Sequence, residues 1–466
     1  MLLRATWRRF KRVRGELAWV LAGQGLAFVG SFFSVKLLSN ILGPAGYGEL
    51  AFGITIAGLI QIFIYGPLGQ VIIRFLSICR ERVQLPAYFF LAKRAHVACA
   101  SLVMVSIVAG SLFTDRFIGR QWALIVFFGG LYGLASGINI SFSSFQAALR
   151  QRRIVALHQG ADNWLRPLMA LALLFFFRNS GYVALIGFLG AVLLVDVSQW
   201  RFARRDRDLR DSWNATPNRG DVIRYRRELL AYGSPFLVWA GIGSISMFGD
   251  RWTLQYLSGA RELGIYAALY QIANAPVSVL GGVVSQLMVP VIFDRAGDLG
   301  SQQQVRHSIG LLHKTAVVFT GLVTGAGLAI YRFSEPLARF VTSPVIARSH
   351  QLLWIIFLGL VVFQLAQMMV VIGQIYQKTK GYILAYAINA VATLTCSYLF
   401  GKKYGILGIA IALCVSNCLY LIAVLSINWR IKTVAGKALK SLQSNAEAKE
   451  RQLQQVRAEH AVESVR

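Results

Sequence analysis

Apolar runs of membrane-spanning length recur along almost the whole chain. A helix needs about 20 apolar residues to cross the roughly 30 Å hydrocarbon core of a bilayer, and the 466 residues contain twelve such runs. Backbone polar groups inside a bilayer must be paired within the segment, which favours helices. The sequence therefore predicts an all-α polytopic membrane protein. The expected spans are 17–38, 50–73, 95–113, 122–145, 154–177, 181–200, 233–257, 264–292, 306–330, 352–376, 381–400 and 404–427.

The composition agrees with this prediction. The chain is 56% hydrophobic and 15% charged, whereas soluble domains carry about 25% charged residues. This balance excludes a disordered chain and argues against a soluble enzyme. The five cysteines lie in or beside apolar runs and form no CxxC pair, so we expect small packing residues rather than disulfides or a metal site.

The distribution of basic residues predicts the orientation in the membrane. The net charge of +28 would suggest a nucleic-acid partner for a soluble protein. On the twelve-span map, however, 34 of the 48 Lys and Arg residues lie on the side of the N-terminus, 9 on the opposite side and five within spans. Cytoplasmic loops of membrane proteins carry such an excess. We therefore expect both termini in the cytoplasm and no nucleic-acid partner.

The two halves of the sequence resemble each other. An offset of 216 residues aligns Gly43 with Gly259 and Gly48 with Gly264. Six spans in each repeat give two lobes of the same orientation, as in the parallel halves of some secondary transporters. The expected division is a basic cytoplasmic N-terminus at 1–16, an N-lobe at 17–200, a basic cytoplasmic linker at 201–232, a C-lobe at 233–427 and a polar cytoplasmic tail at 428–466.

Polar side chains share one helical face in several spans. Such residues are costly inside a bilayer, and they either join helices together or line a hydrated space. Their presence in both halves favours a shared central cavity. The candidate cavity-lining residues are Gln24, Ser31, Ser136, Asn139, Ser143, Gln146, Ser244, Gln255, Gln271, Asn274, Ser278, Gln364 and Gln367.

Besides Arg306 and Lys314 in the first turns of the ninth span, three basic residues fall inside the expected spans. Arg251 lies on a polar face and keeps its proton, so it is the best candidate for contact with an anionic ligand, unless it pairs with Asp250. Arg166 is a second candidate, although Asp162 one turn earlier could neutralise it. Lys36 is a third, with snorkelling to the interface as its alternative. Asp162 and Asp250 are also candidates for coupling transport to an ion.

Matched positions in the two halves carry helix-breaking residues. Gly66-Pro67 lies within the second span and Gly281-Gly282 within the eighth. Broken helices in corresponding halves often flank a transport site, and a simple kink is the alternative.

No enzyme motif is present in the sequence. Walker A, HExxH and GxSxG patterns are absent and the six histidines do not cluster with metal-ligand spacing. We expect no enzyme activity, no cofactor and no metal. Without a Walker A motif, an ion gradient, the membrane potential or a substrate gradient would have to drive transport.

Three segments resemble the signatures of a known family. Leu42–Leu50 (LGPAGYGEL) is similar to the LGPxxYGxL signature of polysaccharide flippases, and Gly66–Phe75 (GPLGQVIIRF) to their GLGQAxxRF segment. Asp250-Arg251 and the 257–266 segment that follows resemble their second-lobe motif. Arg74, inside the second segment, is a further candidate anion-binding residue.

The resemblance implies a fold and a function. The superfamily is that of the multidrug/oligosaccharidyl-lipid/polysaccharide exporters, which have two six-helix lobes around a central cavity that opens alternately to either side. The implied role is to flip an oligosaccharide linked to polyprenyl pyrophosphate across the bacterial inner membrane, for O-antigen or exopolysaccharide biosynthesis. Implied partners are this lipid-linked oligosaccharide, membrane lipids, a polysaccharide polymerase and glycosyltransferases.

One alternative function remains open at this stage. Drug exporters of the same superfamily couple transport to a cation, commonly through an acid in the first lobe. The first span here contains Lys36 and no acid, which favours the flippase over a cation-coupled multidrug exporter.

Overall fold

The computed structural model describes residues 2–81, 84–149, 151–204, 212–213, 215–296, 302–376 and 378–463. Side chains are described from Gly25 to Thr433, apart from those of residues 77, 80, 81, 152, 286, 287, 290 and 302. Every element in this part of the chain is a helix. The elements are α1 Leu2–Ile60, η1 Gln61–Tyr65, α2 Gly66–Glu81, α3 Leu85–Phe117, α4 Arg120–Ala148, α5 Arg152–Phe176, α6 Gly181–Ala203, α8 Arg219–Val283, η2 Val284–Met288, α9 Val289–Ala296, α10 Gln302–Arg332, α11 Ser334–Val341, α12 Pro344–Ala347, α13 Leu352–Ile375 and α14 Gly381–Glu463.

Three of the long helices are hairpins that reverse direction at one glycine. The backbone has positive φ at Gly43 (φ 64°, ψ −179°), Gly259 (φ 78°, ψ −176°) and Gly405 (φ 59°, ψ −138°). Residues with a Cβ rarely adopt these angles, so glycine is what permits each turn. Two of the three are the glycines that the internal repeat aligned.

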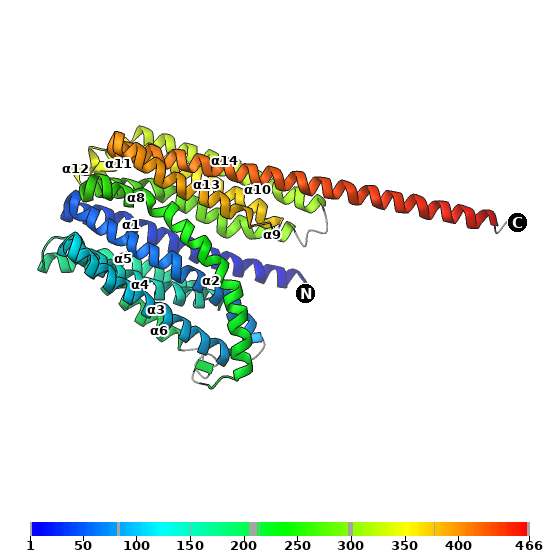
Figure 1. Cartoon of the computed structure of the whole chain (residues 1–466), viewed down its shortest axis with the longest axis horizontal. Coiled ribbons are helices and arrows are strands. Elements are labelled where there is room, and N and C mark those ends of the chain that lie inside the picture. The colour runs from blue at the N-terminus through cyan, green and yellow to red at the C-terminus, as the bar shows by residue number, and fades with distance from the viewer. Residues whose placement is uncertain are drawn as a thin grey trace.

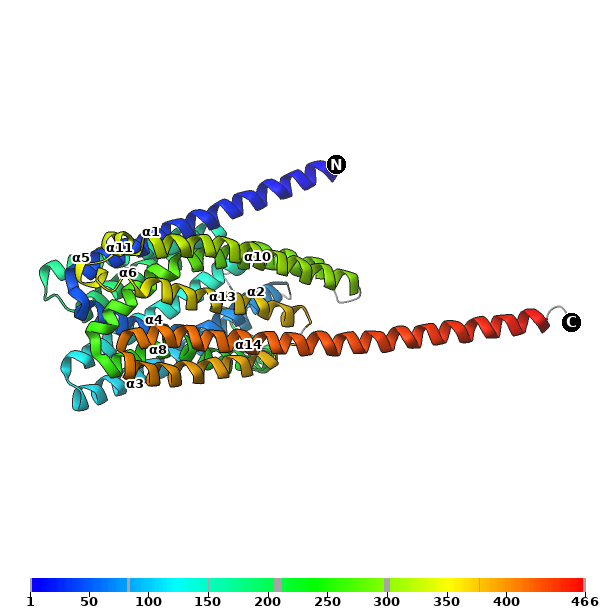
Figure 2. The ribbon, with the colours of Figure 1, turned by 90° about the horizontal axis from the view of Figure 1, so that it is seen from above.

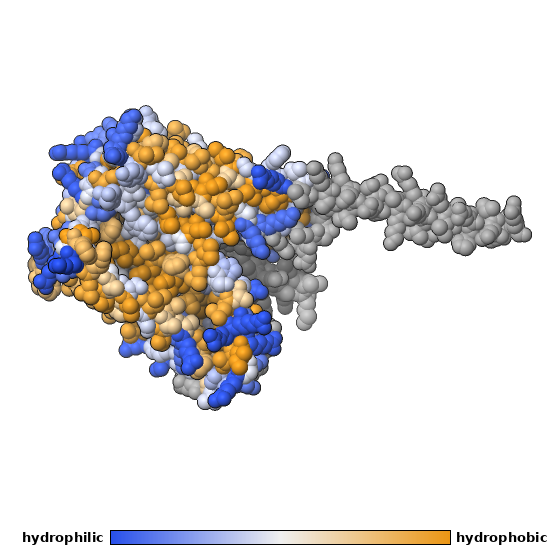
Figure 3. All heavy atoms as spheres, in the orientation of Figure 1, coloured by the Kyte–Doolittle hydropathy of each residue, from blue (hydrophilic) through white to orange (hydrophobic). Residues whose placement is uncertain are grey.

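The helices account for the twelve expected spans. Eight of the described helices are long and apolar enough to cross a membrane. Of these, the α1, α8 and α14 segments contain two spans each, and α5 supplies the remaining one. The predicted fold class is confirmed: the protein is an all-α membrane protein with two six-helix lobes. An apolar band covers the middle of the visible face, with hydrophilic residues at both ends (Figure 3).

The two lobes converge at one end of the molecule (Figure 1). Helices α1 to α6 form the N-lobe, and the later part of α8 with α9 to α14 forms the C-lobe. The three glycine turns lie at the hairpin end, where the lobes meet. Helix α1 begins and α14 finishes on the opposite side, the terminal end (Figures 1 and 2). One apolar core lies in the N-lobe and includes Leu185, and a larger one lies in the C-lobe, includes Leu269 and extends to Val35 of α1.

Backbone contacts between matched glycines join the lobes at the hairpin end. A Cβ added to Gly48 would lie 1.8 Å from the carbonyl oxygen of Ala260, and one added to Gly264 would lie 1.9 Å from that of Pro44. The offset that aligns Gly48 with Gly264 also aligns Pro44 with Ala260. The contact is therefore pseudo-symmetric, with each hairpin presenting a glycine to the backbone of the other.

Two hydrogen bonds extend this contact along the lobe interface. Trp252 Nε1 donates to Thr55 Oγ1 at 3.0 Å, and Gln271 Nε2 donates to Ser31 Oγ at 2.7 Å. Nearer the terminal end on α1, the side chain of Val29 is 53% exposed. On the α1 side of the interface the lobes diverge toward the terminal end (Figure 1). On the other side the first half of α8 stays packed on α2 down to that end, where the ring centroids of Phe75 and Tyr232 are 5.7 Å apart.

Short π-helical segments occur close to both predicted helix breaks. Segment η1 is followed by Gly66, whose N–H donates to the Gln61 carbonyl, and then by Pro67. Segment η2 follows Gly281-Gly282 and likewise ends two residues before a proline, Pro290. Because proline lacks an N–H, each helix widens by one residue just before it. Such π-bulges are frequent at functional sites.

Parts of the expected linker and tail are helical. Residues 219–232, expected in the linker, form the first turns of α8 and pack on the N-lobe. Gln84 Nε2 donates to Asp221 Oδ1 at 3.0 Å, and the Tyr225 hydroxyl donates to Gln84 Oε1. The expected polar tail continues α14 as a helix to Glu463.

The contact between the hairpins predicts opposite effects of the same substitution. Gly48→Ala or Gly264→Ala should lower the melting temperature of the purified protein, because overpacking costs about 1–3 kcal/mol. Gly310→Ala is the control, since nothing lies within 4 Å of its added Cβ and alanine favours a helix by about 1 kcal/mol. Equal melting temperatures for all three variants would contradict the contact.

Candidate functional site

Arg251 lies at the apex of the contact between the lobes. It sits on α8 about 12 Å before the Gly259 turn, from a rise of 1.5 Å per residue. Its guanidinium carbon lies 4.1 Å from the centroid of the Tyr270 ring and 5.7 Å from that of Phe248. Its charge also acts on the Tyr47 hydroxyl in the N-lobe hairpin. Cation–π contacts of this kind hold a guanidinium without neutralising it.

Asp250 does not pair with the neighbouring arginine. Its side chain is buried, with Oδ2 accepting a hydrogen bond from the Tyr266 hydroxyl at 2.7 Å and Oδ1 accepting one from the Arg251 backbone N–H at 2.8 Å. Asp250 and Arg251 are both among the described residues. No carboxylate oxygen in that part of the chain lies within 4.0 Å of the Arg251 guanidinium. Arg251 is therefore a half-buried cation with capacity for an anion, and Asp250 instead ties two helices of the C-lobe together.

The other intramembrane arginine is neutralised. Arg166 forms a bidentate pair with Asp162, in which Nε donates to Oδ1 at 3.0 Å and Nη2 to Oδ2. The pair lies inside the N-lobe, and the side chain of Asp162 is 8% exposed. Arg166 thus has a carboxylate partner where Arg251 has none. A second carboxyl, Asp196, accepts a hydrogen bond from Asn139 Nδ2 at 2.9 Å in the same interior.

The polar face of α4 packs against α6 inside the N-lobe. Besides Asn139, Ser143 accepts a hydrogen bond from Gln199 Nε2 at 3.4 Å. Ser136 and Gln146 are both buried. Of the two interpretations of this polar face, the structure shows helix-to-helix packing, and it does not bring these four side chains to the space between the lobes.

Lys36 connects the lobes at the hairpin end. Its Nζ donates to the backbone carbonyls of Arg339 at 3.0 Å and Thr342 at 3.1 Å. These carbonyls lie at the C-terminus of α11, where a cation is favoured by the helix dipole. The structure thus gives this lysine two acceptors in the other lobe.

Arg74 lies at the terminal end, on α2. Its guanidinium carbon is 4.8 Å from the centroid of the Tyr232 ring in the first turns of α8. The structure therefore does not bring Arg74 together with Arg251. It belongs to the contact between α2 and α8.

The polar face of the eighth span becomes more accessible toward the terminal end. Gln271 is bonded to Ser31, Asn274 is half-buried and Ser278 is exposed. This order follows the divergence of the lobes, so these residues best match the expected cavity lining.

The remaining polar candidates of the C-lobe have local partners or lie half-buried. Ser244 is buried and donates to the Ala240 carbonyl at 2.7 Å. Gln367 Nε2 donates to the Tyr386 hydroxyl. Gln255 and Gln364 are half-buried, and the side chain of Gln24 lies outside the described residues.

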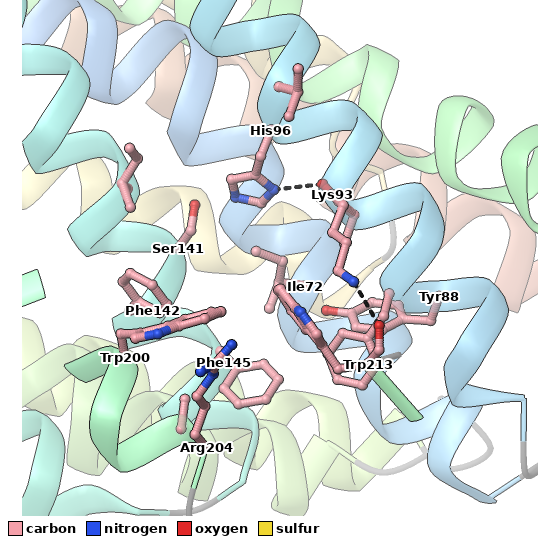
Figure 4. Close-up of a pocket in the computed structure, with 15 residues that line it drawn as sticks. Ile72, Tyr88, Lys93, His96, Ser141, Phe142, Phe145, Trp200, Arg204 and Trp213 are labelled. Atoms are coloured by element: carbon pink, nitrogen blue, oxygen red, sulfur yellow. Dashed lines mark hydrogen bonds between the residues drawn. The ribbon is translucent and has the colours of Figure 1, made fainter. Parts of the chain in front are cut away.

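A well-formed cavity lies away from Arg251. It has a volume of about 450 Å³ and lies among α2, α3, α4 and α6 at the terminal end of the N-lobe (Figure 4). None of the predicted site residues lines it. The sequence analysis also missed Tyr266 and Tyr270, whose signal was an aromatic pair one turn apart on α8. Among the described residues, no cluster of His, Cys, Asp and Glu could hold a metal ion.

Comparison with known protein families assigns the chain to one of them. The family described as "Polysaccharide biosynthesis protein" matches residues 15–295, which is more than half of the chain. The chain belongs to this polysaccharide biosynthesis family. A search of curated proteins gives no match.

Solved structures with similar folds are transporters of one superfamily. An inward-facing multidrug resistance MATE family transporter of the MOP superfamily is 15% identical, with a TM-score of 0.62 over 89% of this chain and 96% of that chain. The lipid II flippase MurJ in an inward closed conformation is 16% identical, with a TM-score of 0.61 over 88% of this chain and 87% of that chain. An outward-facing MATE transporter is 14% identical, with a TM-score of 0.51 over 90% and 95%. At these identities the likeness shows the fold, and the family member has the two-lobe fold of MOP transporters.

The ion pair inside the N-lobe of this family member predicts an asymmetric stability effect. Asp162→Asn should lower the free energy of unfolding by about 3 kcal/mol, because it leaves a buried cation without its partner. Asp162→Asn combined with Arg166→Gln should recover part of the loss. Glu335→Gln is the matched control, since Glu335 forms an exposed pair with Arg339 at the same spacing and such pairs contribute about 0–1 kcal/mol. Denaturant unfolding in detergent measures all three, and equal effects of the two single substitutions would contradict burial of the pair.

Proposed function

We propose that the protein is a flippase for an oligosaccharide linked to polyprenyl pyrophosphate, moving it from the cytoplasmic to the periplasmic leaflet of a bacterial inner membrane for O-antigen or exopolysaccharide biosynthesis. The family match supports polysaccharide biosynthesis, and the two-lobe fold supports transport. The sequence carries no hydrolase or nucleotide-binding motif.

The single observation that carries the substrate class is the unneutralised charge of Arg251. A cation inside a membrane protein without a carboxylate partner is costly, and an anionic ligand would offset that cost. A pyrophosphate provides several acceptor oxygens for the guanidinium, and such charge-assisted hydrogen bonds are among the strongest in proteins. Tyr270 holds the guanidinium from one side, so the opposite side is the expected place for the ligand.

The polar face of the eighth span suits the sugar part of the same substrate. Asn274 and Ser278 lie nearer the terminal end than Gln271, and Ser278 is exposed. Amide and hydroxyl groups are matched partners for sugar hydroxyls. The lipid tail would remain in the bilayer between α1 and α8, where Val29 is exposed.

The distribution of basic residues indicates which end of the molecule faces which side of the membrane. With the termini in the cytoplasm, the joined hairpin end faces the periplasm and the divergent end faces the cytoplasm, where a lipid-linked oligosaccharide is assembled. Breaking the contact between Gly48 and Gly264 while closing the terminal end would produce the opposite state. A cation-coupled multidrug exporter would use an acid in the first lobe. There Asp162 is paired with Arg166 and Asp196 accepts a hydrogen bond from Asn139, which favours the flippase.

Binding measurements test the role of Arg251. Arg251→Gln should weaken binding of the purified protein to a polyprenyl-pyrophosphate-linked oligosaccharide by roughly 10- to 150-fold, from the value of about 1.5–3 kcal/mol for hydrogen bonds to charged groups. Arg251→Lys should retain part of the affinity, because a lysine keeps the charge and loses the planar fork.

Arg261→Gln is the matched control. Arg261 is exposed on the same helix just beyond the Gly259 turn, and its removal changes the net charge equally. Its affinity should equal that of the wild type. Equal weakening by Arg251→Gln and Arg261→Gln, or unchanged affinity in both, would refute a specific anion contact at Arg251.

A further inference from the structure

The N-lobe contains a cavity that the proposed transport path does not use. Its wall includes Ile72 from α2, Phe89 from α3, Phe142 from α4 and Trp200 from α6, with Trp213 from the segment that precedes α8. Figure 4 shows the side chains of Ile72, Phe142, Trp200 and Trp213 around a common space. The volume of about 450 Å³ falls within the ~300–1,000 Å³ that small-molecule sites typically occupy.

Two cations and no anion line this apolar space. Lys93 and Arg204 are its charged residues, and neither Asp nor Glu is among the lining residues. Lys93 Nζ lies 4.2 Å from the Trp213 ring centroid and donates to the Trp213 carbonyl at 2.6 Å. An ammonium group has three donors, so two remain for a ligand.

The second cation is also available. The Arg204 guanidinium carbon lies 4.4 Å from the Trp200 ring centroid. Its guanidinium makes no hydrogen bond or ion pair with the described residues. Figure 4 shows Lys93 and Arg204 reaching toward the space from opposite sides. Each cation lies over one ring of the Trp200–Trp213 pair, whose centroids are 5.4 Å apart, so both cations border the same aromatic wall of the cavity.

The residues around the cavity are of the types found at the surface of a bilayer. Lys93 lies in the first turns of α3 and Arg204 directly follows α6, both at the terminal end. Trp200 and Trp213 accompany them, and tryptophan is enriched at membrane interfaces. Val97, which lines the cavity further along α3, is 66% exposed and opens it sideways toward the hydrocarbon region.

We propose that this cavity binds an anionic phospholipid from the leaflet at the terminal end. The phosphate contacts Lys93 and Arg204, and an acyl segment lies against Phe142 and Phe145. A phospholipid fits better than the transported substrate because every lining residue belongs to the N-lobe or the segment before α8. The cavity therefore does not reach the space between the lobes. A bound lipid would hold Trp213, and with it the connection to the C-lobe, against the N-lobe.

Lipid retention in native mass spectrometry tests this assignment on the full-length protein. Phosphatidylglycerol is the probe, and polyprenyl monophosphate is compared as the other phosphate-bearing lipid. The double variant Lys93→Gln/Arg204→Gln should bind phosphatidylglycerol at least about 10-fold more weakly than wild type, because each lost contact is a hydrogen bond to a charged group.

The matched control is Arg94→Gln/Arg201→Gln. These residues are exposed on the same two helices, are neighbours of the pocket residues and do not line the cavity. This control should retain wild-type affinity. Ala92→Phe keeps both cations and fills the cavity, so it should also displace the lipid, which keeps the test decisive if the double variant fails to fold.

Three outcomes would overturn the proposal. Equal losses in the pocket and control double variants would show attraction to the basic surface alone. Unchanged phosphatidylglycerol binding in Ala92→Phe would place the lipid elsewhere. Binding of polyprenyl monophosphate without binding of phosphatidylglycerol would exclude a phospholipid as the occupant.

Discussion

The arrangement of the two lobes depends on the close approach of two glycine-containing hairpins. The carbonyls of Pro44 and Ala260 occupy the positions that side chains at Gly264 and Gly48 would need, so backbone meets backbone there. This contact closes the hairpin end and brings Arg251 within reach of the other lobe. Besides the backbone contact, Val35 and Phe32 of α1 pack with the apolar core of the C-lobe, so the interface combines close backbone packing, apolar side chains and a few hydrogen bonds.

Two arginines within the membrane differ in the groups that contact their guanidinium. Arg166 is held by Asp162, and the pair contributes to the N-lobe interior as a neutral unit. Arg251 is held by an aromatic ring and has no carboxylate in direct contact among the described residues, although Asp250 lies next to it in the chain. In a medium of low dielectric constant an uncompensated charge interacts strongly with any ion that enters. The same residue type therefore serves packing in one lobe and, in our proposal, ligand binding in the other.

The helical fold and the two-lobe repeat could be predicted from the sequence because hydropathy and internal repeats are local or periodic signals, whereas the turn at each aligned glycine became evident only in the structure. The pairing of Asp162 with Arg166 was also readable, since the residues lie one turn apart. Helical periodicity could not decide which neighbour Ser143 faces, because one polar face suits both packing and a cavity. Contacts between distant residues, such as Lys36 with the end of α11 or Lys93 with Trp213, arise only once the helices are assembled.

Transbilayer movement in proteoliposomes tests the central claim most directly. The purified protein is reconstituted with a fluorescent oligosaccharide linked to polyprenyl pyrophosphate in one leaflet, and its appearance in the other leaflet is followed by chemical quenching. A flippase should accelerate this movement over protein-free vesicles, and in the same vesicles should leave the distribution of a cationic dye unchanged. Export of the dye without movement of the lipid-linked oligosaccharide would contradict the account.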